Sequence, residues 1–118
     1  MAVDKVVQEA SAQALCALAD IPDGGQTAVD AWLPDGEESL ILMRAGEAVT
    51  AWLNVCPHAG RRLDYAPGRF LQKDDRVICA VHGATFERAS GVCVAGPCCG
   101  SSLRRIAVRV ADGRVWLA

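Results

Sequence analysis

Long apolar runs are missing from this 118-residue sequence, and their absence excludes several classes of protein. No stretch approaches the roughly 20 apolar residues that span a bilayer. Residues 1–9 carry acidic side chains early and contain no apolar core of a signal peptide, so we expect a cytoplasmic protein without a membrane anchor. A Gly-rich nucleotide loop, a linker, an internal repeat and a low-complexity tract are also missing, and the length predicts a single folded domain.

A sustained helical period is absent as well, apart from the first residues. We expect residues 1–13 to form an N-terminal tail or a short helix and residues 14–118 to form the domain. Short β-type runs separated by turn signals predict strands at 14–18, 26–33, 39–44, 48–55, 76–80, 85–88, 92–94, 106–110 and 114–117. The Asp112-Gly113 turn marks the clearest hairpin. The fold class that follows is all-β, an antiparallel sandwich or small barrel.

Charge of one sign is scarce in each half of the chain, although the net charge is only −2. Residues 1–55 carry nine acidic and two basic side chains, whereas residues 56–105 carry eight basic and four acidic ones. The basic side chains are either solvated surface charge or a docking face for an acidic partner. Nucleic acid is excluded as a partner, since the overall balance is acidic and no helix-turn-helix or aromatic-basic platform is present. The basic residues are Arg61, Arg62, Arg69, Lys73, Arg76, Arg88, Arg104 and Arg105.

Histidine is the rarest of the ligand-forming residues, with only two in the chain, and both follow a cysteine closely. The two boxes are Cys56-Pro57-His58 and Cys79-Ala80-Val81-His82, and twenty residues separate His58 from Cys79. Two thiolates and two imidazoles suit zinc or an iron–sulfur cluster. Each box follows a predicted strand, which places the ligands on loops at the ends of rigid elements. Gly60 and Gly83 allow backbone N–H groups to approach a bound group.

Three kinds of site compete for these boxes. Structural zinc of the Cys₂His₂ type normally takes two cysteines from one box and two histidines from the other. Nucleophilic catalysis by a cysteine needs one thiol, one base and an orienting group, which a duplicated Cys/His pair does not resemble. In a Rieske centre two cysteines hold one iron and two histidines hold the other, so one Cys and one His from each loop fit this centre best.

The chain resembles the Rieske-type ferredoxin family, in its soluble, low-potential branch. The resemblance is carried by Cys56-Pro-His58-Ala-Gly60 and Cys79-Ala-Val-His82-Gly83-Ala, and extends through Leu63-Asp64, Phe86, Gly91-Val92-Cys93 and Gly96-Pro97. It implies an antiparallel β domain with an inserted cluster-binding subdomain, here about residues 56–98. It also implies one [2Fe-2S] cluster per chain, with Cys56 and Cys79 on the inner iron and His58 and His82 on the outer one.

The same resemblance implies a one-electron carrier with no catalytic activity of its own. Its partners would be a reductase and a terminal oxygenase, docking near His58 and His82 and the basic face. One alternative is a small accessory subunit of a larger reductase, similar to the small subunit of nitrite reductase, which would dock on a large subunit. Another is a structural zinc-binding interaction module.

Some residues depart from the family pattern or stand outside the boxes. Members of the respiratory branch carry a serine and a tyrosine that donate hydroxyl bonds to sulfur, where this chain has Ala84 and Phe86, so we expect a reduction potential on the order of −150 mV. Asp64 and Glu87 are isolated carboxylates, for which we expect solvated surface roles. The remaining cysteines are expected to be small buried hydrophobes, and the tryptophans to pack on sheets or in the core. These residues are Cys16, Cys93, Cys98, Cys99, Trp32, Trp52 and Trp116.

Overall fold

The computed structural model describes residues 13–57, 60–80, 83–97 and 100–118. In this part of the chain the regular structure is almost entirely β, and the one short helical turn is a 3₁₀ helix, η1. No helix among the described residues is long and apolar enough to cross a membrane. The elements are β1 (Ala14–Ala17), η1 (Leu18–Asp20), β2 (Gln26–Leu33), β3 (Gly36–Ala45), β4 (Ala48–Leu53), β5 (Leu71–Lys73), β6 (Arg76–Ile78), β7 (Thr85–Glu87), β8 (Cys93–Ala95), β9 (Arg105–Ile106), β10 (Val108–Ala111) and β11 (Arg114–Leu117).

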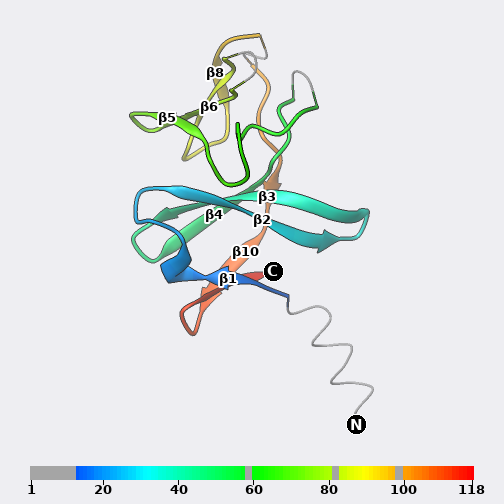
Figure 1. The fold of residues 1–118 in the computed structure, drawn as a ribbon, viewed down its shortest axis with the longest axis vertical. Coiled ribbons are helices and arrows are strands. Elements are labelled where there is room, and N and C mark those ends of the chain that lie inside the picture. Colours follow the sequence, from blue (N-terminus) through cyan, green and yellow to red (C-terminus); the bar gives the residue numbers. More distant parts are fainter. Residues whose placement is uncertain (1–12, 58–59, 81–82, 98–99) are drawn as a thin grey trace.

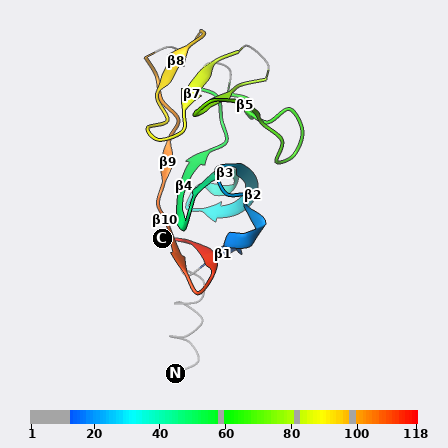
Figure 2. The same cartoon turned by 90° about the vertical axis from the view of Figure 1, so that its left-hand side faces the viewer.

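These strands form antiparallel sheets that follow one another along the long axis of the molecule (Figures 1 and 2). The central sheet has the order β2-β3-β4-β9, and a sheet of order β1-β11-β10 covers one of its faces. Beyond its other face lies the sheet β5-β6-β7-β8. This last sheet lies in the sequence between β4 and β9, two strands that pair with each other. The segment from 54 to 104 is therefore an insertion between neighbouring strands of one sheet.

The run Leu40-Ile41-Leu42-Met43 on β3 is buried throughout, because the central sheet is covered on both faces. Leu40 and Leu42 contribute to a core that the β1-β11-β10 sheet completes, together with Val115 of β11. Ile41 and Met43 point the other way and join a second core formed by the insertion. Alternation of side chains along a strand explains this division, and a continuous apolar run is typical of a strand buried on both faces.

The predicted strands agree with the observed ones in most of the chain, and the all-β antiparallel class is confirmed. Residues 26–33 and 114–117 have the predicted bounds, and the Asp112-Gly113 turn has positive φ at both residues, as a type I′ hairpin requires. The predicted strand 106–110 is instead divided at Ala107, so that β9 pairs with β4 and β10 pairs with β11. The exposed strand β5 was not predicted, because its three residues present no apolar alternation.

Trp52 on β4 joins the insertion to the central sheet. Its side chain is buried in the second core, and the ring lies directly against the backbone of Gly91, where an added Cβ would come within 2.6 Å of Cζ3. The guanidinium carbon of Arg105 lies 5.8 Å from the ring centroid, within the range of a cation–π contact. The indole N–H has no hydrogen-bond partner among the described residues.

Arg88 forms a second link between the insertion and the central sheet. Its guanidinium donates to the carbonyl of Gly25 at 2.9 Å and to the side chain of Gln26 at the start of β2. Burial lowers the pKa of Arg88 against the opposing effect of Asp75. The insertion therefore contacts the rest of the chain at two places. Gly91 of the insertion packs against Trp52 of β4, and Arg88 of the insertion donates to the carbonyl of Gly25, just before β2.

We predict that Gly91→Ala destabilises the protein by about 2 to 4 kcal/mol, because the new methyl group adds an overpacking cost to the cost of a positive φ. Gly46→Ala is the matched control, since Gly46 also has a positive φ but no atom lies within 4 Å of the added Cβ. It should cost about 1 kcal/mol. Urea unfolding of both variants measures the difference, and equal losses would show that the Trp52 contact is not tightly packed.

Candidate metal centre

Cys56 and Cys79 begin two loops that close in the same way. In the first loop the N–H of Cys56 donates to the carbonyl of Arg61 at 2.6 Å, and the N–H of Gly60 donates to the carbonyl of Cys56 at 2.8 Å. In the second loop the N–H of Cys79 donates to the carbonyl of Ala84 at 2.7 Å. The N–H of Gly83 returns to the carbonyl of Cys79 at 3.0 Å. Each loop is therefore a six-residue turn, from 56 to 61 and from 79 to 84, with the cysteine at its base.

The glycine in each loop is required by its backbone conformation. Gly60 has a φ of 67° and Gly83 a φ of 75°, in the left-handed region that residues with a Cβ rarely adopt. The predicted reason for these glycines, the approach of backbone N–H groups to a bound group, stays a prediction, and the structure adds a second reason in the loop closure. The left-handed glycine reverses the direction of the chain, so that the carbonyl of the residue after it can accept the N–H of the cysteine.

Cys93 begins a third loop that closes similarly. Its N–H donates to the carbonyl of Ser101 at 2.8 Å, and the N–H of Gly100, whose φ is 99°, donates to the carbonyl of Cys93 at 3.2 Å. Gly96 of this loop touches the second loop so closely that an added Cβ would lie 2.7 Å from the Cα of Ala84. The Gly96-Pro97 segment therefore lies against the loop that begins at Cys79.

The two box cysteines share one apolar environment. Cys56 is 0% exposed and Cys79 is 1% exposed, and both belong to the second core. Phe86 and Ala84 are fully buried in the same core, so no hydroxyl occupies either position. Cys93 is buried there as well, as predicted, whereas Cys16 is only partly buried on β1. Cys98 and Cys99 lie outside the described residues.

His58 and His82 also lie outside the described residues, so their positions as ligands stay a prediction. Within the described ranges no group of three or more His, Cys, Asp or Glu side chains is arranged to hold a metal ion. The same limit applies to the predicted tail or helix, of which only Gln13 is described. The side chain of Gln13 pairs with the backbone of Trp32 through two hydrogen bonds of 2.9 and 3.1 Å.

Asn54, two residues before Cys56, is a site residue that the sequence reasoning missed. It is the buried polar residue of the described core, at 1% exposure. Its Oδ1 accepts the N–H of Leu63 at 2.9 Å, and its Nδ2 donates to the Oγ of Ser39 at 3.2 Å. The carbonyl of Leu63 in turn accepts the N–H of Ala80 at 3.4 Å, which links the exit of the first loop to the start of the second.

Asp64 is the second missed residue, and its predicted solvated role is wrong. Its side chain is 1% exposed, and it accepts two hydrogen bonds from the Arg62 guanidinium at 2.7 and 2.9 Å and one from the N–H of Gly68 at 3.1 Å. Burial raises the pKa of this carboxyl, but the hydrogen bonds from Arg62, Gly68 and Asn54 outweigh it, so the pKa lies below its usual value. The pair was missed because Arg62 and Asp64 lie two residues apart in a loop, where the sequence has no periodic pattern that indicates which side chains meet.

The predicted basic face is divided in the structure. Arg62 is paired with Asp64, Arg88 is half-buried against the central sheet, and Arg105 lies over Trp52. Arg61 remains exposed at the end of the first loop. The described residues exposed around the three loops are otherwise uncharged, namely Pro57, Gly60, Gly83, Ala95, Gly96, Pro97, Gly100 and Ser101.

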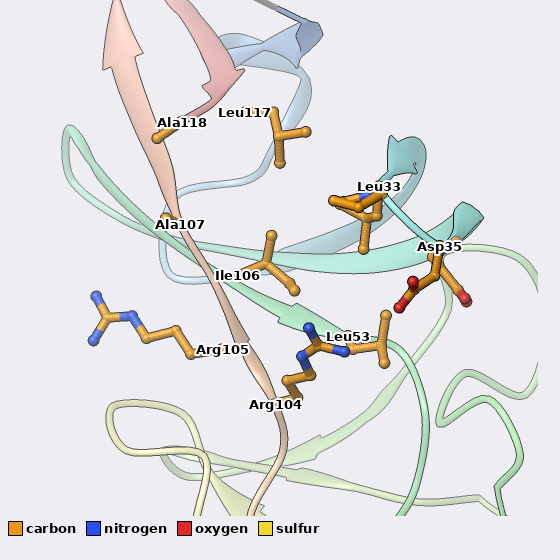
Figure 3. A pocket seen from close by; sticks show the side chains of 11 residues that line it. Leu33, Asp35, Leu53, Arg104, Arg105, Ile106, Ala107, Leu117 and Ala118 are labelled. Carbon is orange, nitrogen blue, oxygen red and sulfur yellow. The ribbon is translucent and has the colours of Figure 1, made fainter. Parts of the chain in front are cut away.

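A pocket of about 290 Å³ lies away from these loops, at the edge of the central sheet (Figure 3). Its floor is apolar, with Leu53, Ile106 and Leu117, and Asp35 and Arg104 stand at its rim. Neither box cysteine lines it. The two box cysteines therefore lie in the buried core of the insertion and not in this pocket. The prediction that Trp32 packs on a sheet or in the core also fails, because its side chain is 65% exposed.

Comparison with known proteins shows the family of this chain. A family model described as the Rieske [2Fe-2S] domain matches residues 11–111. The chain belongs to this family. The family carries a [2Fe-2S] cluster, and the Rieske chain described here is expected to bind one through the loops that begin at Cys56 and Cys79. A comparison with curated proteins gave no match.

Solved structures of Rieske ferredoxins share the fold. The chain is similar to the ferredoxin of carbazole 1,9a-dioxygenase from Nocardioides aromaticivorans IC177, with 27% identity, a TM-score of 0.70, and coverage of 92% of this chain and 97% of that chain. It is also similar to the Sphingomonas yanoikuyae B1 ferredoxin, with 25% identity, a TM-score of 0.70, and coverage of 90% and 96%. The terminal oxygenase of carbazole 1,9a-dioxygenase from Nocardioides aromaticivorans IC177 is matched over 29% of its length, with 26% identity, a TM-score of 0.70, and 90% of this chain covered.

The described residues fit an iron–sulfur cluster in two respects. Two thiols lie at equivalent places in two loops of one apolar core, and thiolate is the ligand that iron in such clusters prefers. The apolar side chains around them limit access of water, which is a property that tunes reduction potential. The insertion therefore offers two buried thiols and an apolar surrounding that fit such a cluster.

We predict that Asp64→Asn lowers the free energy of unfolding by about 1 to 2 kcal/mol at pH 7, because hydrogen bonds to a charged carboxylate are replaced by weaker ones. A carboxyl whose folded pKa is depressed stabilises the fold above its unfolded pKa of about 3.9 and loses this contribution as pH falls through the folded value. The difference in free energy of unfolding between the variant and the unmodified protein should therefore become smaller as the pH falls from about 5 to about 3, a range that includes the unfolded pKa.

Urea unfolding at a series of pH values measures this gap. Asp35→Asn is the control, since Asp35 is an exposed carboxylate in the turn between β2 and β3. It should leave the unfolding free energy within about 0.5 kcal/mol of the original value. A gap for Asp64→Asn that stays constant across the pH range would contradict a role for the charge of Asp64.

Proposed function

We propose that this Rieske chain is a one-electron carrier whose cluster is held by Cys56 and Cys79 on one iron and by His58 and His82 on the other. The observation that supports it most directly is the pair of equivalent loops, each with a buried cysteine at its base. Each loop contributes one cysteine and one histidine in the sequence, so both loops would contact both irons. When bound, a [2Fe-2S] cluster accepts and releases one electron.

The protein's own residues would supply the conditions for that exchange. The backbone of each box cysteine is held by two backbone hydrogen bonds, and both side chains lie in a packed core, so the cysteine positions would change little between redox states. The surrounding apolar core, with Phe86 and Ala84 in place of hydroxyl donors, supports a potential at the low end of the Rieske range, on the order of −150 mV. No catalytic residue is assigned, since the proposed role is transfer of an electron only.

We predict that Cys56→Ser and Cys79→Ser each abolish cluster binding, because serine is a much poorer ligand for iron in these clusters. Iron content falls from two per chain toward zero, and the electron paramagnetic resonance signal of the dithionite-reduced protein disappears. Cys16→Ser is the matched control, since Cys16 lies on β1 in the other core and should retain the iron and the signal.

His58→Ala and His82→Ala test the histidine ligands in the same assay and should also lose the Rieske signal. A colourless protein with one zinc per chain would contradict the proposal and would favour a zinc-binding interaction module. Retention of a full signal in either cysteine variant would show that the ligand assignment is wrong.

As partners we propose a reductase that supplies the electron and a terminal oxygenase that receives it. The support is that a ferredoxin of similar length, that of carbazole 1,9a-dioxygenase, covers nearly the whole of this chain. Docking would take place at the uncharged surface around the three loops, next to the proposed histidine ligands. Arg61 would be the cation closest in sequence to that surface, since Arg62, Arg88 and Arg105 have contacts elsewhere.

We predict that Arg61→Glu slows oxidation of the reduced protein by ferricyanide about tenfold at low ionic strength, because it reverses the charge beside the first loop and ferricyanide is a trivalent anion. Arg114→Glu is the control: Arg114 is exposed at the start of β11, in the sheet farthest from the loops. Stopped-flow rates compare the two. An equal effect of both variants would mean that only net charge matters and that electrons do not leave near Arg61.

A small accessory subunit of a larger reductase is the second candidate. It would use the same fold and the same ligands but would not diffuse freely. A stable large subunit that copurifies with the chain at fixed stoichiometry would favour this candidate, whereas a monomer that shuttles electrons at catalytic amounts would favour the ferredoxin.

A further inference from the structure

Asn54 occupies a position where its side-chain amide reaches two separate parts of the chain, β3 and the segment after the first loop. The residue follows the last residue of β4 and precedes the first loop. Its own N–H donates to the carbonyl of Ser39 on β3 at 2.9 Å, and its Nδ2 donates to the Oγ of the same serine at 3.2 Å. Its Oδ1 accepts the N–H of Leu63 at 2.9 Å, on the far side of the loop.

These bonds enclose the first loop in a nested arrangement. The side chain of Asn54 joins residues 54 and 63, the Cys56–Arg61 backbone bond lies inside that pair, and the Gly60–Cys56 bond lies inside both. The bond between the Asn54 side chain and the Leu63 N–H joins the two ends of the segment that contains the first loop. A change in the position of Cys56 relative to these ends would strain this bond. Asn54 is 99% hidden from solvent, so the bond is not exchanged for one to water.

The same bond reaches the second loop through Leu63. The carbonyl of Leu63 accepts the N–H of Ala80, the residue directly after Cys79, at 3.4 Å. Leu63 is therefore held on its N–H side by Asn54 and holds Ala80 on its carbonyl side. A fixed Leu63 sets the separation of the two loop stems, and with it the relative placement of the two thiols.

Neither a hydrophobic residue nor an acid satisfies all of these partners. Leucine has a similar size but leaves the Leu63 N–H and the Ser39 hydroxyl without the amide. Aspartate accepts the Leu63 N–H, but it cannot donate to Ser39 and places a second carboxylate beside Asp64, whose pKa the Asn54 amide helps to lower. The Asn54 amide supplies an acceptor for the Leu63 N–H and a donor for the Ser39 hydroxyl, which are the two partners that it contacts.

We propose that Asn54 is a positioning residue, whose side-chain amide sets the register of the two ligand loops so that Cys56 and Cys79 meet one cluster. This inference rests on the proposed ligation by these two cysteines. Partners that orient ligands typically change metal affinity by about 10- to 100-fold when removed.

The test compares Asn54→Leu, Asn54→Asp and Ser39→Ala with the unmodified protein, after iron content and the Rieske signal of the unmodified protein have been established. Asn54→Leu should release iron to a chelator about tenfold faster and should broaden the paramagnetic resonance lines, because the thiols sample a wider range of geometries. Hydrogen exchange at the Leu63 amide should also lose its protection. Ser39→Ala should change both much less, since the Oδ1–Leu63 bond persists.

Val115→Ala is the matched control for general loss of stability, because Val115 is fully buried in the core on the other side of the central sheet. It should lower the melting temperature but leave the line widths and the Leu63 exchange unchanged. If Asn54→Leu does not fold, Asn54→Ala carries the test with the same expected direction, because alanine also removes the acceptor of the Leu63 N–H. Asn54→Asp keeps that acceptor, so the Leu63 amide should stay protected in this variant.

The inference would be overturned if Asn54→Leu and Asn54→Ala had the line widths and the iron-release rate of the unmodified protein, even if their melting temperatures fell. Absence of iron from the unmodified protein would instead contradict the proposed function. Failure of the proposed function is therefore seen in the unmodified protein, and failure of the inference about Asn54 is seen in the Asn54 variants.

Discussion

The central sheet is buried on both faces along β3 and β4, and most of the structure depends on this constraint. Side chains on one face of β3 complete the core with β11, and those on the other face complete the core that contains Cys56 and Cys79. A strand that supports two cores cannot shift its register by one residue, because every side chain would change core. The end of β4 at Leu53 is thereby fixed, and the first loop begins three residues later, at Cys56.

The loops themselves are held mainly by backbone hydrogen bonds. Cysteine, a left-handed glycine and the residue after it form the same closure in the loops that begin at Cys56 and Cys79, and a longer version begins at Cys93. Backbone bonds of this kind tolerate many side chains at the intervening positions, where the sequence has the two histidines that we propose as ligands. Side-chain bonds also hold the stem of the first loop, where Asn54 and Asp64 fix the chain on each side.

The electrostatics of the molecule are more local than the charge of each half of the sequence indicates. Arg62 neutralises a buried carboxylate, Arg88 binds the backbone of the central sheet, and Arg105 lies over an aromatic ring. Each of these cations stabilises the attachment or the stem of the insertion. The surface around the loops is mostly small and uncharged, with Arg61 as its nearest exposed cation in sequence. Such a surface favours close approach of a partner, with charge acting on the rate of encounter.

The all-β class, most of the strands, the family and the two boxes can be predicted from the amino-acid sequence, because alternation, turn residues and ligand spacing are local signals. The Asp112-Gly113 hairpin is predictable for the same reason. The division of 106–110 at Ala107, the short strand β5, the burial of Asp64 and the hydrogen bonds of Asn54 are seen only in the folded molecule. Each of these depends on contacts between residues far apart in the chain or in loops without a period, and one sequence carries no pattern for such contacts.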